Sequence, residues 1–306
     1  MRAQVNMLPD GRRLHLHDGP IDIVLEAFGT PAEIRRAYDA AVSRFSCVLD
    51  ELCAELAALR SPATSKQCVL HGVVGQRMLL AVAPYARDHF ITPMAAVAGA
   101  VAEEILFAMT SEAHLRRAYV NDGGDIALHL VPGERFSVGM VDYAIWKHKT
   151  SSFGTEDPLF GTLVLDSSDA VRGIATSGWR GRSFSLGIAD AVTVLAATAA
   201  MADAAATIIA NGVDLPGHSA VLRVPARDLD PQSDLVDRLV TREVGHLTNA
   251  EVVAALERGL CTAESLQRRG LIHSAALHLR GETRVILQPG TSFHHVPSPI
   301  GRVANA

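Results

Sequence analysis

Tight turns between short apolar runs constrain the fold of this chain more than any other feature. Pro9-Asp10-Gly11 and Asp18-Gly19-Pro20 separate three runs of strand-like residues between positions 4 and 28. Turns of this chemistry join neighbouring strands, so the chain is expected to open with a small sheet. From Thr30 to about Leu59 the apolar residues recur at steps of three and four, which indicates a long helix. The pattern predicts an α+β fold with antiparallel sheets and packed helices.

Strand-like runs and the helical spacing of three and four residues both recur further along the chain. An apolar stripe predicts a second helix from Pro93 to Met109, whose small Ala and Gly residues allow close approach of another backbone or of a ligand. Residues 132–168 show no regular pattern, and Lys147 to Ser152 are expected to form a mobile loop. Further strands are predicted over residues 117–120, 126–131, 171–176 and 192–195, and an Ala-rich helix over 198–209.

The composition changes along the chain and suggests three parts. Residues 1–240 are expected to form the main domain. Residues 241–288 are expected to form a small C-terminal extension with helical and strand segments. The helices are predicted over residues 248–258 and 262–269, and the strand over 274–279. Residues 289–306 are rich in Pro, Gly and Ser, and a flexible tail is expected there.

Charge and hydropathy argue against two classes of partner. The net charge is -5, and the chain has no run of basic residues like those that nucleic-acid binding needs. The longest apolar stretch, Ala191 to Ala202, falls short of the roughly 20 residues that a membrane span requires. Residues 1–20 contain no apolar export signal, so a cytoplasmic protein is expected. The cysteines lack CxxC spacing and the histidines lack zinc-ligand spacing, so neither a disulfide nor a zinc site is expected.

Asp203 and Thr207 are the first candidates for chemistry. They lie four residues apart in the predicted Ala-rich helix and therefore share one helix face. A carboxylate and a hydroxyl arranged in this way can supply two oxygens to Mg2+, which keeps several waters. Asp and Thr on a helix surface are more often simply solvated. From spacing alone, both interpretations stay open.

Two glycine-containing loops are the other candidates. The loop from Asn121 to Asp125 exposes backbone N–H groups through paired glycines, although the same residues are the usual ones of a plain hairpin turn. The segment from Thr176 to Gly187 gathers hydroxyls, glycines and two arginines, which suits phosphate or carboxylate recognition. A surface loop explains this segment equally well.

Taken in chain order, these segments resemble a known family. The ordered motifs are Ile91–Glu103, Asn121–Ile126, Ala175–Gly178, Ala189–Val194 and Ala202–Thr207. They are similar to the motifs of the ApbE-like superfamily, in its uncharacterised cytoplasmic branch, and the resemblance spans about residues 20–212. It implies the ApbE-like, T-fold-related fold, in which the helix of Asp203 packs close to the 121–125 loop.

The resemblance also implies cofactors and a site. ApbE proteins are Mg2+-dependent flavin transferases, which cleave FAD and attach FMN to a threonine or serine of a target protein. By this resemblance Asp203 and Thr207 bind Mg2+, together with a backbone carbonyl from Val97 to Gly99. FAD or FMN would be bound by the residues that match the family's flavin-site loop and Ser-Gly turn: Asn121, Gly123, Gly124, Asp125, Thr176, Ser177 and Gly178.

Two departures from the family pattern bear on the chemistry. The family's Lys-Gly-Tyr stretch is Ala98-Gly99-Ala100 here, and its His-x-x-Asp-Pro-x-Thr-Gly segment is reduced to Ser183–Ala189. Each lost transition-state contact can cost about 3 kcal/mol. Efficient transfer of FMN is therefore not expected, while binding of a flavin or a related phosphorylated ring compound is expected to persist.

Three functions stay open. The first is divalent-metal-dependent binding, with transfer or hydrolysis, of a flavin or related phosphorylated ring compound. The second is a non-catalytic role in cofactor maturation or as an accessory protein, which would suit the link of some archaeal relatives of this branch to sulfide assimilation into homocysteine. The third is an assembly protein with a vestigial pocket. The expected partners are a phosphorylated or flavin-like small molecule, a protein target and a second copy of the chain.

Overall fold

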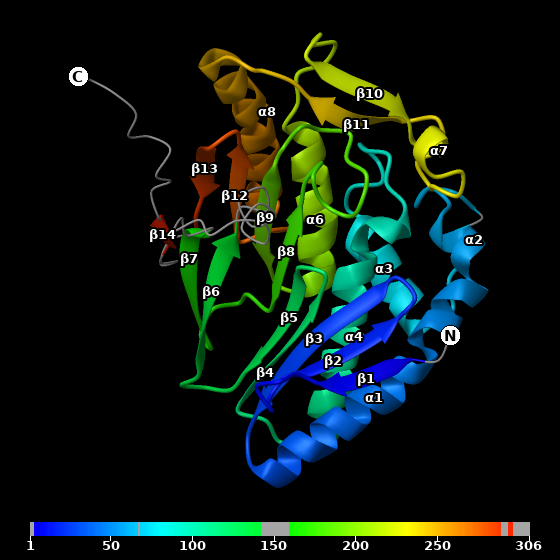
Figure 1. The fold of residues 1–306 in the computed structure, drawn as a ribbon, viewed down its shortest axis with the longest axis vertical. Coiled ribbons are helices and arrows are strands. Elements are labelled where there is room, and N and C mark those ends of the chain that lie inside the picture. The colour runs from blue at the N-terminus through cyan, green and yellow to red at the C-terminus, as the bar shows by residue number, and fades with distance from the viewer. Residues whose placement is uncertain (1–2, 67, 142–158, 289–292, 296–306) are drawn as a thin grey trace. The chain divides into compact units, whose positions relative to one another are not determined.

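The computed structural model describes residues 3–66, 68–141, 159–288 and 293–295. The chain packs into two compact units, whose helices and strands are labelled in Figure 1. The first unit consists of Met1–Glu134, Ser167–Thr176 and Val194–Ile208, and the second of Arg135–Asp166, Ser177–Thr193 and Ile209–Ala306. The domain boundaries expected at residues 240 and 288 stay predictions.

The α+β class is confirmed. The strands are β1 (Gln4–Met7), β2 (Leu14–Asp18), β3 (Ile21–Phe28), β4 (Arg117–Asp122), β5 (Asp125–Leu130), β6 (Arg135–Val141), β7 (Leu159–Asp166), β8 (Gly173–Ser177), β9 (Ala191–Ala196), β10 (Val221–Pro225), β11 (Leu239–Val244), β12 (Ser274–Leu279), β13 (Glu282–Ile286) and β14 (Phe293–His295). The helices are α1 (Pro31–Ala54), α2 (Leu56–Leu59), α3 (Val73–Val82), the short 3-10 helix η1 (Pro93–Ala96), α4 (Val97–Glu112), α6 (Ala199–Gly212), α7 (Ala226–Leu229) and α8 (Asn249–Arg268).

In the first unit, antiparallel pairing joins β1, β2, β3, β4, β5 and β8 in that order. Opposite residues of paired strands share a face, and the register places Val120 opposite Leu25 and Asp122 opposite Ile23. These apolar residues are buried, and helices α1 and α4 pack on strands of this sheet. Asp122 therefore lies on the same buried face as the apolar core of β3 and β4.

In the second unit, strands pair with one another in three groups. β6 pairs with β7 and β7 with β14, β10 pairs with β11, and β12 pairs with β13, all antiparallel. Helix α8 packs against β12 and β13. Its N-terminus carries a capping box, in which Thr248 accepts from the Glu251 N–H and the Glu251 side chain accepts from the Thr248 N–H.

Several expected elements differ in detail from the observed ones. The helix expected over residues 30–59 ends at Ala54 and resumes as α2 after Glu55. The two C-terminal helices expected from the composition are one helix, α8, because Gly259 provides close packing rather than a break. A Cβ at Gly259 would lie 2.2 Å from the Val213 side chain.

Three further expectations concern the irregular middle of the chain and the tail. Residues 132–168, expected to be the least regular part of the chain, contain the paired strands β6 and β7. The loop expected from Lys147 to Ser152 lies outside the described residues. Most of the tail from residue 289 also lies outside them, and its described part, Phe293–His295, forms β14.

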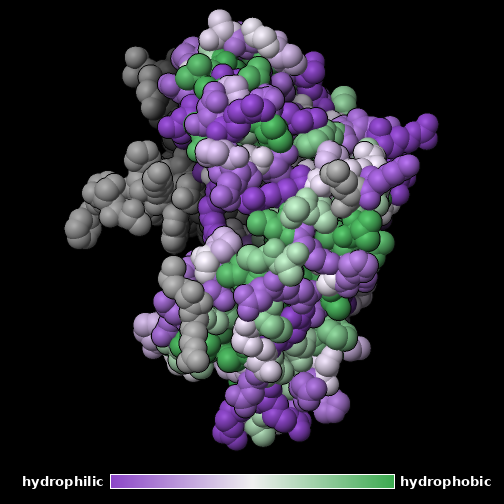
Figure 2. Space-filling view, turned by 90° about the vertical axis from the view of Figure 1, so that its right-hand side faces the viewer, coloured by the Kyte–Doolittle hydropathy of each residue, from purple (hydrophilic) through white to green (hydrophobic). Residues whose placement is uncertain are grey.

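Among the residues that the structure describes, one helical segment, Pro93–Glu112, is long and apolar enough to cross a membrane by length and composition. Half of it is buried inside the structure, and α4 packs against α1, β4 and β5. Core helices pass the same test, and this packing is that of a core helix. Figure 2 shows apolar residues exposed at the surface, and Val69, Val73, Leu80 and Phe107 of the first unit are each more than half exposed.

Candidate functional site

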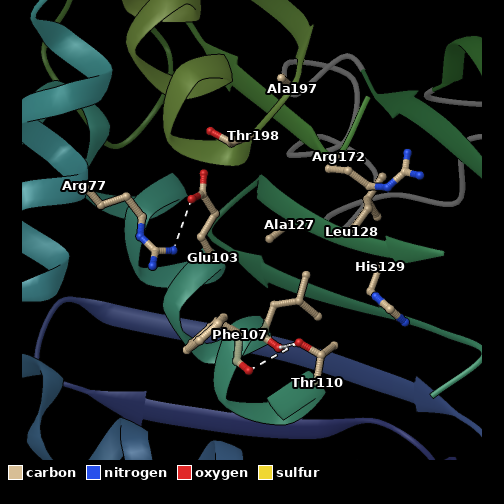
Figure 3. Close-up of a pocket in the computed structure, with 11 residues that line it drawn as sticks. Arg77, Glu103, Phe107, Thr110, Ala127, Leu128, His129, Arg172, Ala197 and Thr198 are labelled. Carbon is tan, nitrogen blue, oxygen red and sulfur yellow. Dashed lines mark hydrogen bonds and ion pairs between the residues drawn. The ribbon is translucent and has the colours of Figure 1, made fainter. Parts of the chain in front are cut away.

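The start of helix α6 is fixed by contacts within the first unit. The Thr198 hydroxyl accepts a hydrogen bond from the Met201 N–H at 3.3 Å, as an N-cap residue does. Glu103 of α4 accepts from the Ala200 N–H at 2.7 Å, and its other oxygen lies 3.1 Å from Arg77. Figure 3 shows Arg77 pointing towards Glu103, with Thr198 close by. A carboxylate at a helix N-terminus interacts favourably with the helix dipole.

Two glycines allow the start of α6 to lie directly against its neighbours. A Cβ added at Gly99 of α4 would lie 2.3 Å from the Ala199 carbonyl oxygen. A Cβ added at Gly173 of β8 would lie 2.1 Å from the Thr198 carbonyl. No side chain fits at these distances, so both positions require glycine. The small residues of this helix were expected to allow close approach of another backbone or of a ligand. At Gly99 the structure shows close approach of another backbone.

Asp203 lies one turn into α6 and contacts the N-terminus of α4. Its Oδ2 accepts a hydrogen bond from the Gly99 N–H at 3.1 Å, between residues 104 positions apart in the chain. The residue keeps some solvent exposure, but protein atoms surround its carboxyl closely. Loss of hydration is the largest cause that raises the pKa of Asp203, and together with the nearby negative charge of Asp122 it brings that pKa to about 7. Asp203 is therefore a carboxyl whose charge is costly in this structure.

Asp122 is the second carboxyl of this site, and sequence reasoning did not select it. Its side chain is buried at 5% exposure at the end of β4, where its Oδ1 accepts from the Asp22 N–H at 3.3 Å. Burial alternates along β4, so that Ala118, Val120 and Asp122 share the buried face. This alternation was visible in the sequence and could have marked Asp122 as an inward-facing carboxylate.

The loop from Asn121 to Asp125 is a tight hairpin turn. Gly123 and Gly124 occupy the turn with φ of 63° and 116°, and the Asn121 side chain accepts from the Gly124 N–H at 2.8 Å. The plain hairpin, which the sequence left as one of two readings, is thus present. A Cβ at Gly124 would meet no atom within 4 Å, so the turn faces open space. Asp125 fixes the turn to β8, because its Oδ1 accepts from the Thr176 N–H at 3.1 Å.

The predicted site residues fall into both units. Asn121, Gly123, Gly124, Asp125, Thr176, Asp203 and Thr207 belong to the first unit, and Ser177 and Gly178 to the second. Asp203 lies near the loop, as its interaction with Asp122 shows, and Thr207 follows one turn later on α6. In the second unit, Gly178 packs against the chain at Asp190, where a Cβ would lie 2.5 Å from a carbonyl oxygen.

Asp122 and Asp203 are the carboxyl groups that could hold a cation at this site. Within the described part of the chain, no three or more His, Cys, Asp or Glu side chains are grouped so that they could hold a metal ion. A cation at this place would therefore depend on two carboxylates, Asp122 and Asp203, with the Thr207 hydroxyl, backbone carbonyls and water. Carboxylate and hydroxyl oxygens with several waters are the donors that Mg2+ prefers.

A separate cavity of about 190 Å3 lies beside α4 in the first unit, and Figure 3 shows the side chains around it. Its charged groups already have partners. Arg172 donates to the backbone carbonyls of Ser167, Asp169 and Val171, and the ring of His129 contacts the Leu115 carbonyl. Arg77 is paired with Glu103 and Glu104. These pairings make the cavity a weaker candidate for chemistry than the Asp122 and Asp203 pair.

Comparison with family models gives a match over residues 5–285 to a family described as AbpE bacteria. The chain belongs to this family. The curated relatives of this AbpE bacteria chain include UPF0280 protein MK0206 of Methanopyrus kandleri, 40% identical over 121 residues, and a UPF0280 protein of Methanothermobacter thermautotrophicus, 36% identical over 128 residues. These matches cover 40% and 41% of this chain, and 43% and 44% of the relatives. A UPF0280 protein of Methanosphaerula palustris is 39% identical over 132 residues, or 42% of this chain and 49% of the relative.

These comparisons correct the family expected from the sequence. The ordered motifs indicated the ApbE-like superfamily of flavin transferases, but the matching model and the UPF0280 relatives point to a different family. The resemblance was therefore wrong. The motifs that carried it are short and rich in Gly, Ala and Asp, and such residues recur wherever tight turns and close helix packing are needed. The chain spans less than half the length of each of the curated relatives named above.

Proposed function

We propose that this protein binds a phosphorylated small molecule through a divalent cation held between Asp122 and Asp203. The observation that supports this most directly is that Asp122 of β4 lies near enough to Asp203 of α6 for its charge to raise the pKa of Asp203. Two such groups repel each other when both are ionised. A divalent cation between them would remove that repulsion.

The surroundings suit such a cation. The Gly99 N–H holds one oxygen of Asp203, and the Asp22 N–H holds one oxygen of Asp122, so both carboxyls have fixed orientations. Thr207, one turn after Asp203, would add a hydroxyl oxygen. When bound, Mg2+ would neutralise charge on phosphate oxygens and orient them. The residues of this chain would hold the ion and keep its ligand beside the glycine turn.

The turn at Gly123 and Gly124 supports approach of a ligand. The space in front of Gly124 is open, and glycine backbones allow a ligand to lie against the chain. The ligand we propose is a phosphorylated ring compound, and the reaction we propose is group transfer or hydrolysis. An accessory role without catalysis is the alternative. FAD and FMN were implied only by the resemblance that the comparisons overturn, so they serve here as test ligands.

A second function is favoured by the pKa of Asp203. A carboxyl with a pKa of about 7 can donate and accept a proton near neutral pH, which is the property of a general acid or base. In this alternative Asp122 and Asp203 share a proton rather than a cation. The two functions differ in whether divalent ions bind at the pair.

Titration calorimetry of the full chain with Mg2+ and Mn2+, with and without FMN or ATP as phosphorylated probes, tests the proposal. Wild-type protein is expected to bind Mn2+, and Asp203→Asn and Asp122→Asn are each expected to weaken binding at least tenfold. Asp39→Asn, which changes an exposed aspartate on α1, is the matched control and should bind as wild type does. Unchanged Mn2+ binding in both site variants would overturn the proposal. Absence of binding in wild type would favour the shared proton.

A further inference from the structure

The second unit contains an arginine that its neighbours hold in one position. The Oδ1 of Asp190 accepts hydrogen bonds from Arg180 Nε at 2.7 Å and from Trp179 Nε1 at 3.2 Å. The Oδ2 of Asp190 accepts from the Arg280 N–H at 2.7 Å, so the carboxylate itself is fixed from two sides. The Arg180 guanidinium also lies over the Trp179 ring, with its central carbon 4.6 Å from the ring centroid.

This arrangement leaves the outer edge of the guanidinium available. Only Nε of Arg180 bonds to Asp190, and in the described part of the chain neither Nη atom of Arg180 makes a hydrogen bond. The Arg180 side chain is 30% exposed, so this edge reaches solvent. The two Nη groups form a planar pair of donors, which matches two oxygens of a phosphate or carboxylate.

Preorganisation distinguishes Arg180 from an ordinary surface arginine. A free arginine side chain loses conformational entropy when it binds an anion, whereas stacking on Trp179 and bonding to Asp190 have already restricted this one. Ser183 is exposed nearby and adds a hydroxyl donor, whereas the Gly181 N–H already donates to the Gly178 carbonyl. Arg182 is also exposed. Its positive charge offsets the negative charge of Asp190 in the electrostatic field that an anion meets.

A purely structural ion pair is the competing explanation, and it makes a different prediction. If Arg180 serves only to neutralise Asp190, lysine in its place would do the same and no anion would bind. If Arg180 presents its outer edge to a ligand, lysine would keep the charge but lose the paired donors and the Nε contact. Anion binding by the Arg180→Lys variant therefore distinguishes a structural ion pair from a ligand-binding arginine.

We propose that Arg180, oriented by Asp190 and stacked on Trp179, binds a phosphate or carboxylate group of a small molecule. This site is independent of the cation proposed between Asp122 and Asp203, because it uses other residues and needs no metal. Asp190 is a positioning residue in it and does not touch the ligand.

Titration of the full chain in EDTA, with inorganic phosphate and separately with citrate, tests this proposal. The readouts are calorimetry and the NMR signal of the Arg180 Nε–H, assigned by its loss in Arg180→Lys. We expect saturable binding of at least one probe, with a shift of that signal. Binding of phosphate alone would assign a phosphate ligand, and binding of citrate alone a carboxylate ligand.

Three variants make the test specific. Arg180→Lys should weaken binding at least tenfold although it keeps the charge, and Asp190→Asn should weaken it although it removes a negative charge. Arg268→Lys is the matched control, since that arginine is 71% exposed in the same unit. Circular dichroism and urea midpoints must match wild type for a variant to count, and the Arg180→Lys comparison alone decides if Asp190→Asn fails to fold. No binding of either probe to wild type, or equal binding by Arg180→Lys, would overturn the proposal.

Discussion

Asp203→Asn is expected to stabilise the protein at alkaline pH while removing its cation site. The structure holds the pKa of Asp203 at about 7, above the 3.8 of an ordinary aspartate, because burial and Asp122 both disfavour its charge. Asparagine has nearly the same shape, and its amide oxygen can still accept from the Gly99 N–H. The substitution therefore removes the charge and keeps most of the packing.

The magnitude follows from the difference between the two pKa values. At about 1.4 kcal/mol for each pKa unit, ionising Asp203 in the folded protein costs at most about 4 kcal/mol. Solvent that still reaches Asp203 reduces this cost, and replacing a charged acceptor by a neutral one loses about 1 kcal/mol of hydrogen bonding. A net stabilisation of about 1–2 kcal/mol at pH 8 remains.

The sign of the pH dependence is fixed by the direction of the shift. Because the folded pKa is raised, the contribution of protonated Asp203 to stability is fully present below pH 3.8 and is lost as the pH rises through about 7. The advantage of Asp203→Asn should therefore be small at pH 5 and grow towards pH 8. Functional carboxylates often carry such a stability cost.

Urea denaturation in EDTA, followed by far-UV circular dichroism at pH 5 and pH 8, measures this difference. Asp39→Asn serves as the control, because it removes the same charge from an exposed position on α1. If Asp203→Asn were no more stable than wild type at pH 8, or gained the same amount at both pH values, the reasoning about the buried charge would be refuted.

Four other substitutions test the packing, an ion-pair cluster and the capping by urea denaturation. Gly99→Ala should cost about 3 kcal/mol or more, because its Cβ would lie 2.3 Å from the Ala199 carbonyl oxygen, and a loss below about 1 kcal/mol would contradict that contact. Gly124→Ala meets no atom and should cost only the strain of its positive φ, roughly 1–2 kcal/mol. Glu104→Gln should cost about 3 kcal/mol, since this buried carboxylate pairs with two arginines, and a neutral outcome would show that the pairing adds nothing. Thr248→Ala should cost about 1 kcal/mol by removing the capping box of α8, with helix content by circular dichroism as the second readout.

The sequence predicted the elements whose signals are local. Strand β12 has the bounds predicted for it, 274–279, and the glycine turn between β4 and β5 lies where the residues of the Asn121 to Asp125 loop placed it. Helix α3 was not predicted, because the groups that cap its N-terminus come from residues distant in the sequence. Its N-cap residue, Gly72, has no side chain. The carboxylates of Glu51 on α1 and of Glu55, the residue after α1, accept the first N–H groups of α3 instead.

The candidate site was predictable only in part. The spacing of Asp203 and Thr207 predicted a shared helix face, and strand alternation marks Asp122 once β4 is known. Their meeting depends on packing that no local pattern records. The close contact of Gly99 with Ala199 brings α4 and α6 together, and the register of β4 turns Asp122 inward. The family assignment failed for a related reason, because short motifs of small residues serve packing as readily as catalysis.

We propose that Asp122 and Asp203 together hold one divalent cation. The most direct test of this claim is an anomalous difference map from crystals of the full chain grown with Mn2+ and a phosphorylated probe. We expect a single Mn2+ peak bonded to the carboxylates of Asp122 and Asp203, with the Thr207 hydroxyl beside it, and no peak there in Asp203→Asn crystals. An empty site between the two carboxylates at saturating Mn2+, with both close enough to share a proton, would contradict the claim.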